Sequence, residues 1–559
     1  MKSNFLKICI IAFLPILAAS CVPNVPEVED LPRDPVSFEY RIDGDYALDY
    51  YIDSDITFKN TSPTQGEAVW DFGDGKTATG DEVKHPFDKA GTYNVKLTIN
   101  GLSKSQVIMI SDIKPLLSIN PIEGGICEVA TTPVSFSLEI PNPKNRELTY
   151  NWIFPARTTN PSGETMETSS ERLPGEVVFG NVGSQSVRLQ VTMDGRMLEE
   201  GVLNVPVGYN KEVPTLYYAV QGGNLMAYKL ISDAPEGMDI LPFDLGLSSG
   251  QHPFNLLFKD SSLYVLDCGT QFYYIDDADK VLGDGKISVV AKDGSKLETM
   301  ISNAGQAAFD DPFYGCIIDN DLYYANRNTG IMKVPLSTRD AVYSSSAYPY
   351  YVQHTTLGYY GAGWSYGSIG GCFGKIADTW YWCKFYNGTG IFRFKDSDIL
   401  LTAISGNGTP PDAGIALGGM MPKSFAYSTK SNKICFTIMD AGYAGFYVCT
   451  LDELNAIGSS KNALAPYKKL FGTLQFEPNN TGKPVAVEGH TSEIVGICQI
   501  AYDEVNDCAY FGYRNTHNDA TCAPTGIYRY NFATDVVEQV LTGDNVYGIV
   551  VNNTPSKLF

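Results

Sequence analysis

The sequence predicts an all-β protein in which two small sandwich modules precede a larger domain built from a repeated unit. Three observations support this fold class. The 559 residues include 35 Tyr, 27 Phe and 53 Gly but only 19% charged residues, and aromatic residues favour strands while glycine favours turns. Short alternating apolar and polar runs are separated by turn residues. A strand-turn-strand unit recurs over residues 213–559. Long helices, which need Ala-, Glu- and Lys-rich periodic segments, are excluded.

The N-terminus has the pattern of an export signal. Two lysines precede an apolar run, Ile8–Leu17, which is too short to cross about 30 Å of hydrocarbon, and small residues lead to Cys21. The pattern resembles a bacterial lipoprotein signal, which implies that residues 1–20 are removed and that Cys21 carries lipid. Ordinary secretion is the alternative. Residues 21–37 are rich in proline and acidic side chains and predict a stiff, solvated tether.

The cysteines leave disulfides open. Outside the signal and Cys21, most of the 12 cysteines lie in strand-like runs, where cysteine usually packs as a small apolar residue. Cys372 would face Cys383 across one predicted hairpin, and Cys435 would lie nearly opposite Cys449 across another. Both pairs are candidates because export permits disulfides. No CxxC pattern or Cys/His spacing in the sequence indicates zinc.

Residues 38–112 have the turn spacing of a small β-sandwich. The specific segments are Trp70-Asp71-Phe72-Gly73-Asp74-Gly75, then His85-Pro86-Phe87, then Gly91-Thr92-Tyr93-Asn94-Val95. They resemble the PKD domain, which implies an immunoglobulin-like sandwich. The two aromatic residues of the first segment alternate with aspartate and share one face, and Asp-Gly suits a tight turn. We interpret the motif as packing and turn chemistry rather than as a binding site.

Residues 115–208 resemble a weaker copy of this module. Tyr150-Asn151-Trp152-Ile153-Phe154 stands where the Trp-Asp-Phe-Gly segment would, and residues 186–193 echo the last strand. The Gly-Asp-Gly turn is missing. We expect a second PKD-like domain, and we expect both modules to act as spacers that hold the following domain away from the membrane.

Residues 213–559 contain six copies of a unit with about four strands, and this period predicts a six-bladed β-propeller. The pattern resembles NHL/TolB-like propellers. Thr-Gly-Ile opens the third strand in three copies. The second and third strands of the copies are predicted at 216–230, 262–276, 321–334, 379–394, 433–449 and 508–530.

The repeat also predicts how the ring closes. Five copies begin with an innermost strand, whereas 216–230 has none before it, and 545–553 reads as an innermost strand with nothing after it. We therefore expect the C-terminal strand to complete the first blade, which removes an open sheet edge. The five other innermost strands are predicted at 254–258, 313–318, 369–375, 424–428 and 494–502.

Long insertions are predicted on one face of the propeller, at 292–311, 337–367, 404–423, 471–493 and 514–524. Function usually lies on loops that a rigid scaffold displays, so we expect the binding face here. The insertion 337–367 is crowded with aromatic rings, which suit sugars and peptides alike. Packing of these rings against the propeller is the alternative. The candidate ligand-binding rings are Tyr348, Tyr350, Tyr351, Tyr359, Tyr360, Trp364 and Tyr366.

Polar residues at the strand ends around the central channel form a second candidate group. They predict a mixed, locally basic mouth for a neutral or acidic ligand, and simple solvation of strand ends is the alternative. The net charge of −22 argues against nucleic-acid binding. The ligand-binding candidates are His252, Arg327, Lys384, His490 and Arg514; Asp311, Lys423 and Asp440 occupy equivalent strand ends.

Catalytic and metal sites are weakly indicated. The sequence offers no evident Ser/His/Asp set or carboxylate pair, so catalysis is uncertain and a non-enzymatic role is favoured. No cofactor is predicted, although calcium is left open at an acidic segment whose spacing fails the EF-hand pattern. That segment contains Asp276, Asp277, Asp279 and Asp284. Four histidines could converge on one face as metal or acid–base groups: His252, His354, His490 and His517.

The order of anchor, tether, PKD-type modules and propeller resembles surface lipoproteins of Bacteroidetes that accompany SusC/SusD-type nutrient importers. The resemblance implies a lipoprotein on the exterior of the outer membrane that binds a glycan, or a peptide, and assists a SusC/SusD-like transporter in polysaccharide utilization. Two alternatives stay open. One is a propeller-based polysaccharide lyase or glycosidase, and the other is a structural subunit of an outer-membrane uptake complex.

Overall fold

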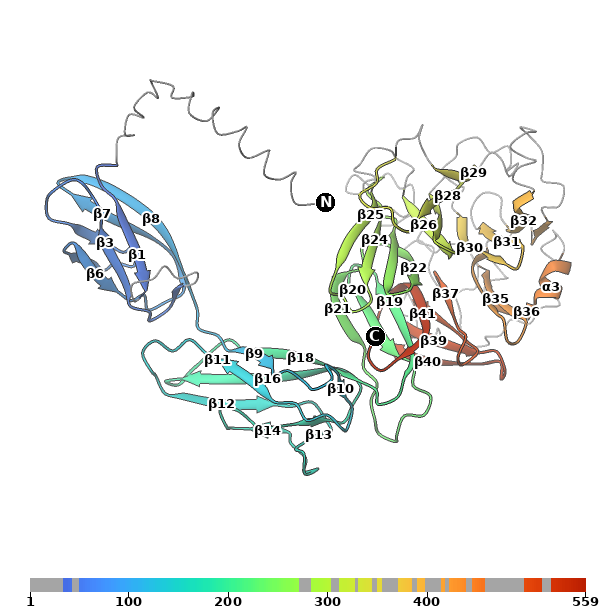
Figure 1. Ribbon diagram of the computed structural model, residues 1–559, viewed down its shortest axis with the longest axis horizontal. Helices are drawn as coiled ribbons and strands as arrows, with labels where there is room; N and C mark the ends of the chain where they lie inside the picture. The colour runs from blue at the N-terminus through green and yellow to red at the C-terminus, as the bar shows by residue number, and fades with distance from the viewer. Residues whose placement is uncertain are drawn as a thin grey trace, which may run out of the picture.

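The protein is all-β in the computed structural model, and its sheets follow one another along the chain (Figure 1). One short helix, α3 (Leu451–Ala456), is present in the described part. No helix within that part is long and apolar enough to span a bilayer. The structure describes residues 34–42, 50–270, 283–302, 311–326, 330–343, 349–353, 370–384, 390–397, 414–417, 422–438, 445–457, 497–514 and 524–559.

The first module packs a three-stranded sheet, β1-β3-β6, against a five-stranded sheet, β2-β8-β7-β4-β5. Alternation places Trp70 and Phe72 inward, where they meet Phe58 from the other sheet. The strands are β1 (Phe38–Ile42), β2 (Tyr50–Tyr51), β3 (Ile56–Asn60), β4 (Val69–Asp71), β5 (Thr77–Thr79), β6 (Glu82–His85), β7 (Gly91–Ile99) and β8 (Leu102–Ser111).

The second module has a larger sheet with the order β10-β18-β16-β12-β14, with β17 paired to β16, and two short sheets, β11-β9 and β13-β15. Trp152 and Phe154 lie in its core beside Phe136. The strands are β9 (Leu116–Ile119), β10 (Cys127–Glu128), β11 (Phe136–Glu139), β12 (Leu148–Ile153), β13 (Thr158–Thr159), β14 (Thr168–Ser169), β15 (Val178–Phe179), β16 (Gly183–Met193), β17 (Arg196–Met197) and β18 (Gly201–Gly208).

The remaining sheets are antiparallel, and their strands follow in chain order within each sheet apart from β41. The orders are β21-β20-β19-β41, β22-β23-β24-β25, β26-β27-β28-β29, β30-β31-β32-β33, β34-β35-β36 and β37-β38-β39-β40. The strands are β19 (Val213–Val220), β20 (Asn224–Lys229), β21 (Phe243–Ser248), β22 (Pro253–Lys259), β23 (Ser262–Asp267), β24 (Lys286–Ala291), β25 (Leu297–Ser302), β26 (Pro312–Ile318), β27 (Asp321–Asn326), β28 (Gly330–Pro335), β29 (Tyr350–Gln353), β30 (Gly370–Ile376), β31 (Thr379–Lys384), β32 (Gly390–Lys395), β33 (Gly414–Ala416), β34 (Pro422–Ser428), β35 (Lys433–Ile438), β36 (Gly445–Thr450), β37 (Ile500–Asp503), β38 (Cys508–Tyr513), β39 (Gly526–Asn531), β40 (Val536–Thr542) and β41 (Val546–Ser556).

One strand of each of these sheets contacts the corresponding strands of neighbouring sheets, and we call these the inner strands: β22, β26, β30, β34, β37 and β41. β22 contacts β41 and β26, β26 contacts β30, β30 contacts β34, β34 contacts β37, and β37 contacts β41. The C-terminal β41 also pairs antiparallel with β19, near the start of this region.

Buried polar side chains join neighbouring inner strands. Asn255 on β22 accepts a hydrogen bond from the backbone of Gly315 on β26, at 3.0 Å. The amide of Gln499 bonds to the backbone of Leu256 on one side and of Ile549 on the other. Such side chains satisfy backbone groups that the sheets leave unpaired, because a buried unpaired amide is costly.

Several expected segments are assigned differently in the structure. The third strand of this copy was expected within 262–276 but is instead β24. β24 pairs antiparallel with β23, with Ser262 opposite Ala291 at one end and Asp267 opposite Lys286 at the other. The acidic segment therefore separates β23 from β24. The insertions expected at 292–311, 337–367 and 404–423 contain the fourth strands β25, β29 and β33. β29 and β33 have only four and three residues, too few for a clear apolar and polar alternation, so composition alone does not reveal them.

The two candidate disulfides are not formed, and all four cysteines are free thiols. Ile434, rather than Cys435, lies opposite Cys449, and a one-residue offset places the two cysteines on opposite faces of the sheet. A bulge between Gly370 and Phe373 displaces Cys372 from Cys383. Burial raises the pKa of Cys372 to about 11 and that of Cys449 to about 12, as expected for inert packed thiols.

Candidate functional site

A cluster of basic and aromatic side chains lies where several inner strands begin. Phe254 is the second residue of β22, Lys423 the second of β34 and Tyr547 the second of β41. Arg514 directly follows β38. Antiparallel pairing brings the end of each second strand to the start of its inner strand, so residues from four sheets meet where the inner strands begin. The inner-strand cluster consists of His252, Phe254, Lys423, Cys498, Arg514 and Tyr547.

Two basic groups meet on one sulfur in this cluster. The Lys423 Nζ and an Arg514 terminal nitrogen each lie 3.4 Å from the Cys498 Sγ. Lys423 is fully buried and Arg514 is 4% exposed. Burial lowers the pKa of Lys423 to about 8, and the charge of Arg514 acts in the same direction, against the attraction of Cys498. Burying two basic groups close together costs free energy. Groups with a shifted pKa, such as Lys423, concentrate at functional sites.

Aromatic rings surround the basic groups. The Arg514 guanidinium carbon lies 3.9 Å from the centroid of the Tyr547 ring, and the Lys423 Nζ lies 5.6 Å from that of Phe254. The Phe254 and Tyr547 rings meet edge to face at 5.2 Å. Cation–π contacts of this kind are strengthened by desolvation. Together the rings and cations form a compact buried cluster that combines apolar faces with positive charge.

His252 lies at the edge of this cluster. Its ring centroid lies 5.8 Å from that of Tyr547, and its Nδ1 lies 2.7 Å from the Gly269 carbonyl oxygen. A carbonyl oxygen can only accept, so Nδ1 carries the proton of that hydrogen bond. The Asp267 carboxylate accepts from the backbone nitrogen of His252 at 2.8 Å, which holds the backbone that carries the ring.

The acidic residues near the cluster serve loop structure. Asp311, expected at an inner-strand start, accepts hydrogen bonds from the backbone nitrogens of Gly283 and Gly285 at 3.2 and 3.0 Å. Asp284, considered for calcium, accepts from the hydroxyl of Thr270 at 2.6 Å. Within the described residues, no three His, Cys, Asp or Glu side chains gather as a metal site.

The predicted binding residues divide into three groups. His252 and Arg514 both contact the ring of Tyr547. Tyr350 and Tyr351 lie in β29 rather than in a loop, and Lys384 ends β31. The others lie outside the described residues: Cys21, Arg327, Tyr348, Tyr359, Tyr360, Trp364, Tyr366 and His490, together with Asp276, Asp277, Asp279, His354, Asp440 and His517.

Tyr351 packs between two sheets. Its ring lies edge to face with Tyr323 at 5.0 Å, and its hydroxyl donates to Asp396 at 2.5 Å. Burial of Asp396 opposes its ionisation, but hydrogen bonds from Lys375, Tyr351 and Trp380 outweigh that effect and lower its pKa to about 2. This ring therefore has a packing role in the structure.

Sequence reasoning missed Phe254, Cys498 and Tyr547. They occupy the same inner-strand starts that drew attention to Lys423, but apolar residues there read as core. Tyr314 was missed for the same reason, and its hydroxyl donates to the Cys498 carbonyl oxygen at 2.9 Å. These residues could have been identified from their position at the start of an inner strand in the repeat, but not from their residue type.

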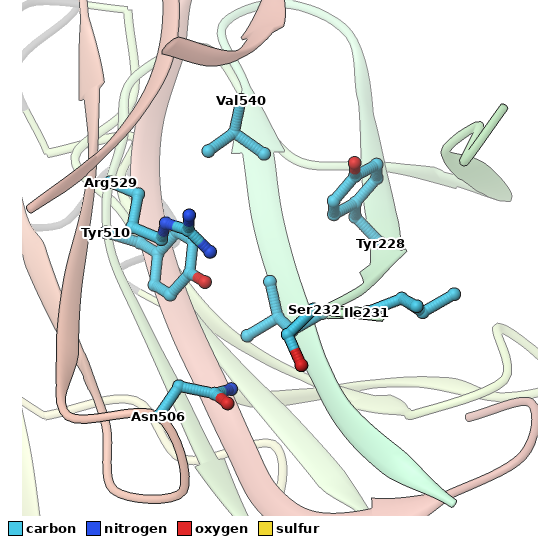
Figure 2. A pocket seen from close by; sticks show the side chains of 8 residues that line it. Tyr228, Ile231, Ser232, Asn506, Tyr510, Arg529 and Val540 are labelled. Atoms are coloured by element: carbon cyan, nitrogen blue, oxygen red, sulfur yellow. The ribbon is translucent and has the colours of Figure 1, made fainter. Parts of the chain in front are cut away.

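A small cavity lies away from the cluster, between the first and last of the antiparallel sheets (Figure 2). Its volume is about 40 Å³, which accommodates a water molecule, whereas pockets for organic ligands measure roughly 300–1,000 Å³. Arg529 at its edge is paired with Glu538. The lining residues are Tyr228, Leu230, Ile231, Ser232, Asn506, Tyr510, Arg529 and Val540.

The aromatic motif of the first module stabilises its core and turn. The Trp70 Nε1 donates to the Gly80 carbonyl oxygen at 2.8 Å. The Nε2 of His85 lies 2.9 Å from the Asp74 carboxylate, and the His85 ring stacks on Phe72 with centroids 3.8 Å apart. These contacts account for the residue types of the motif without a ligand.

Comparisons with known proteins identify one part of the chain. Residues 44–109 match the family described as the PKD domain. No curated protein sequence matches the chain. Among solved structures, a quinonprotein alcohol dehydrogenase-like protein from Bacteroides thetaiotaomicron is 13% identical, with 78% of this chain and 95% of that chain covered and a TM-score of 0.35. A DUF4784 family protein from Bacteroides caccae is 8% identical, with 78% and 98% covered and a TM-score of 0.31. Likeness at this level carries no argument about activity.

Proposed function

We propose that the protein is a non-catalytic surface lipoprotein whose residues 213–559 form a closed six-bladed β-propeller that binds a glycan. The cyclic contacts of the inner strands and the pairing of β41 with β19 support the propeller. The observation that supports the binding role is the inner-strand cluster, where Lys423 and Arg514 are buried against aromatic rings and His252 is partly exposed at the edge. Rings offer faces to sugars, and cations orient polar or acidic groups.

The connections of the sheets support a binding face at this end. The second strands end, and the inner strands begin, at the same end as the cluster, so the segments between those strand ends start or finish there. They include 268–285, 354–369, 457–499 and 514–525, which are longer than the turns the sheets require. Long connections on a rigid scaffold commonly carry recognition. The unplaced aromatic candidates of 354–366 belong to one of these segments.

The remaining parts of the proposal concern location and partners. Lipid on Cys21 would anchor the chain at the outer membrane, and the acidic tether with the two modules would space the propeller from it. A SusC/SusD-like transporter would receive the captured ligand. Peptide is the second ligand class, because flat rings and basic groups suit both.

The proposal is tested by incubating the full mature chain with a panel of polysaccharides and scoring both retention and new chain ends. Binding without products is expected. Arg514→Gln should weaken retention about tenfold or more, since a charge-assisted contact is lost, and Trp364→Ala should weaken it as well. Arg529→Gln, distant from the cluster, is the matched control. Product formation would instead identify a lyase or glycosidase.

Failure to retain any glycan or peptide would contradict ligand binding. Copurification with a transporter under mild extraction in that case would point to a structural subunit. Folding of each variant is checked by its circular dichroism and thermal midpoint, so that a lost site is distinguished from a lost structure.

A further inference from the structure

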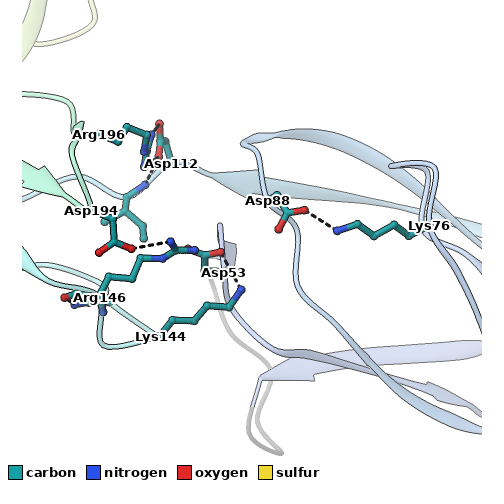
Figure 3. A network of polar contacts seen from close by, with 10 residues as sticks. Asp53, Lys76, Asp88, Asp112, Lys144, Arg146, Asp194 and Arg196 are labelled. Atoms are coloured by element: carbon teal, nitrogen blue, oxygen red, sulfur yellow. Dashed lines mark hydrogen bonds and ion pairs between the residues drawn. The ribbon is translucent and has the colours of Figure 1, made fainter.

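The first and second modules are joined by ion pairs (Figure 3). The Asp53 carboxylate of the first module receives the Lys144 Nζ at 3.1 Å and an Arg146 terminal nitrogen at 2.7 Å. Arg196 of the second module binds both carboxylate oxygens of Asp112, at 3.0 and 3.1 Å. Bidentate Arg–carboxylate pairs fix direction as well as distance. These contacts define the first joint.

Asp53 is placed to act as the centre of this joint. Its backbone adopts a left-handed φ of 67°, which aspartate and asparagine tolerate better than most residues. Its nitrogen donates to the Phe87 carbonyl oxygen at 2.9 Å, which ties it to the core of the first module. Its side chain is only 8% exposed. Because this carboxylate is held by the first module and contacts two cations from the loop before β12, it restrains the orientation of the second module relative to the first.

Arg146 extends the joint within the second module. Its other terminal nitrogen lies 3.0 Å from Asp194, in the β16–β17 hairpin that also carries Arg196. The loop before β12 and this hairpin are therefore held together where they face the first module. Lys144, Asp53, Arg146 and Asp194 form one connected network, and the bidentate pair of Arg196 with Asp112 lies on the same hairpin as Asp194. Isolated exposed pairs, in contrast, contribute little.

The joint between the second module and the following sheets has a different chemistry. The Val182 nitrogen donates to the Asp239 carbonyl oxygen at 3.1 Å, the Leu241 nitrogen donates back to Val182 at 2.9 Å, and the Tyr209 nitrogen donates to Lys557 at 2.9 Å. Gly183 packs so closely that a Cβ there would lie 2.0 Å from the Leu241 carbonyl oxygen. Backbone pairing and close packing define this second joint.

We propose that the first joint is a salt-sensitive hinge that Asp53 holds in one orientation, while the second joint is rigid. Salt shortens the reach of charge interactions, from roughly 10 Å at 0.1 M to about 3 Å at 1 M, but hardly affects backbone hydrogen bonds inside a sheet. The hinge would let the first module reorient while the second module stays with the large domain. This inference concerns reach from the anchor and stands independently of what the protein binds.

The test measures distance distributions across each joint in the full mature chain. Fluorophores introduced as non-natural residues at Ser103 and Ser162 report the first joint, and those at Ser162 and Val536 report the second; all three positions are exposed. Between 0.05 and 1 M salt, the first distribution should broaden about twofold, and the second should keep its width. Asp53→Asn, which keeps the shape and tolerates the left-handed φ, should broaden the first distribution already at low salt.

Lys76→Met provides the matched control. Lys76 pairs with Asp88 at 2.6 Å inside the first module, so its loss removes an ion pair that does not itself join the two modules. Its distributions should equal those of the unmodified chain. An unchanged width in both Asp53→Asn and 1 M salt would overturn the hinge, and equal broadening across both joints would overturn the difference between them.

Discussion

The two sandwich modules share an aromatic core but differ in the turn beside it. Trp70 and Phe72 lie nearly parallel, with centroids 6.5 Å apart and planes 2° apart, and Trp152 and Phe154 repeat this at 6.3 Å and 5°. In both modules the indole nitrogen donates to a backbone carbonyl oxygen, of Gly80 at 2.8 Å and of Glu171 at 3.0 Å.

The differing part is turn chemistry. Asp74 and His85 pair in the first module, and Gly73 there is held at a φ of 77° with Asp71 accepting from its nitrogen. The second module lacks the Gly-Asp-Gly turn, and the PKD match stops at residue 109. The comparison shows that the Gly-Asp-Gly part of the motif forms the turn. Packing of the core needs only the alternating aromatic pair and a backbone carbonyl oxygen that accepts from the indole nitrogen.

The largest expected effect comes from removing the shared core. Trp70→Ala and Trp152→Ala should each destabilise their own module by about 3–5 kcal/mol, because each removes a fully buried ring. Hydrogen exchange of the full chain measures this module by module. Equal loss of protection in both modules from either single variant would show that the cores are not independent.

Gly183→Ala probes the joint that only the second module makes with the following sheets. The glycine has a φ of 106°, and an added Cβ would clash with the Leu241 carbonyl oxygen. We expect a loss of roughly 3 kcal/mol and release of the backbone pairs at Val182. Gly195→Ala, at a hairpin with open space around it, is the control for φ strain alone. Intact protection at Leu241 in Gly183→Ala would contradict the close packing.

His85→Ala should cost the first module about 1–3 kcal/mol, since it removes both the partner of Asp74 and the ring stacked on Phe72. His85→Phe keeps a ring but not the hydrogen bond, so it separates the two contributions. The thermal midpoint of the first module is the measurement. A phenylalanine variant as stable as the unmodified chain would assign the effect to stacking alone.

The smallest expected effect is on the first joint in acid. The hydrogen bond from Arg196 lowers the pKa of Asp112 below its ordinary 3.8. The folded joint therefore gains stability above about pH 4 and loses it as pH falls through the lower folded value. Distances across the first joint should broaden in that range. In Asp112→Asn the contribution from this residue should be absent at every pH.

Much of the strand pattern could be predicted from alternation and repeat. The first copy of the repeat has no inner strand before it, and the C-terminal segment reads as an inner strand with no copy after it. The pairing of β41 with β19 follows from these two observations. The fourth strand β29 could not be predicted, because Tyr-rich polar sequence has no alternation that separates a short outer strand from a loop. For Tyr351 the sequence left ligand binding and packing open as alternatives, and the structure shows the ring packed between sheets. The one-residue offset of Cys435 from Cys449 depends on the register between β35 and β36, and the number of residues between the two cysteines does not specify that register.

The sequence by itself determined the all-β class, the two aromatic cores and the repeated four-stranded unit, because alternation records which residues of one strand face inward. Only the tertiary structure decided which distant charges meet. Lys144 reaches Asp53 across 91 positions, and Lys423 reaches Cys498 across 75. Such contacts depend on how separate sheets and modules pack against each other, and no periodicity within a strand reports that packing.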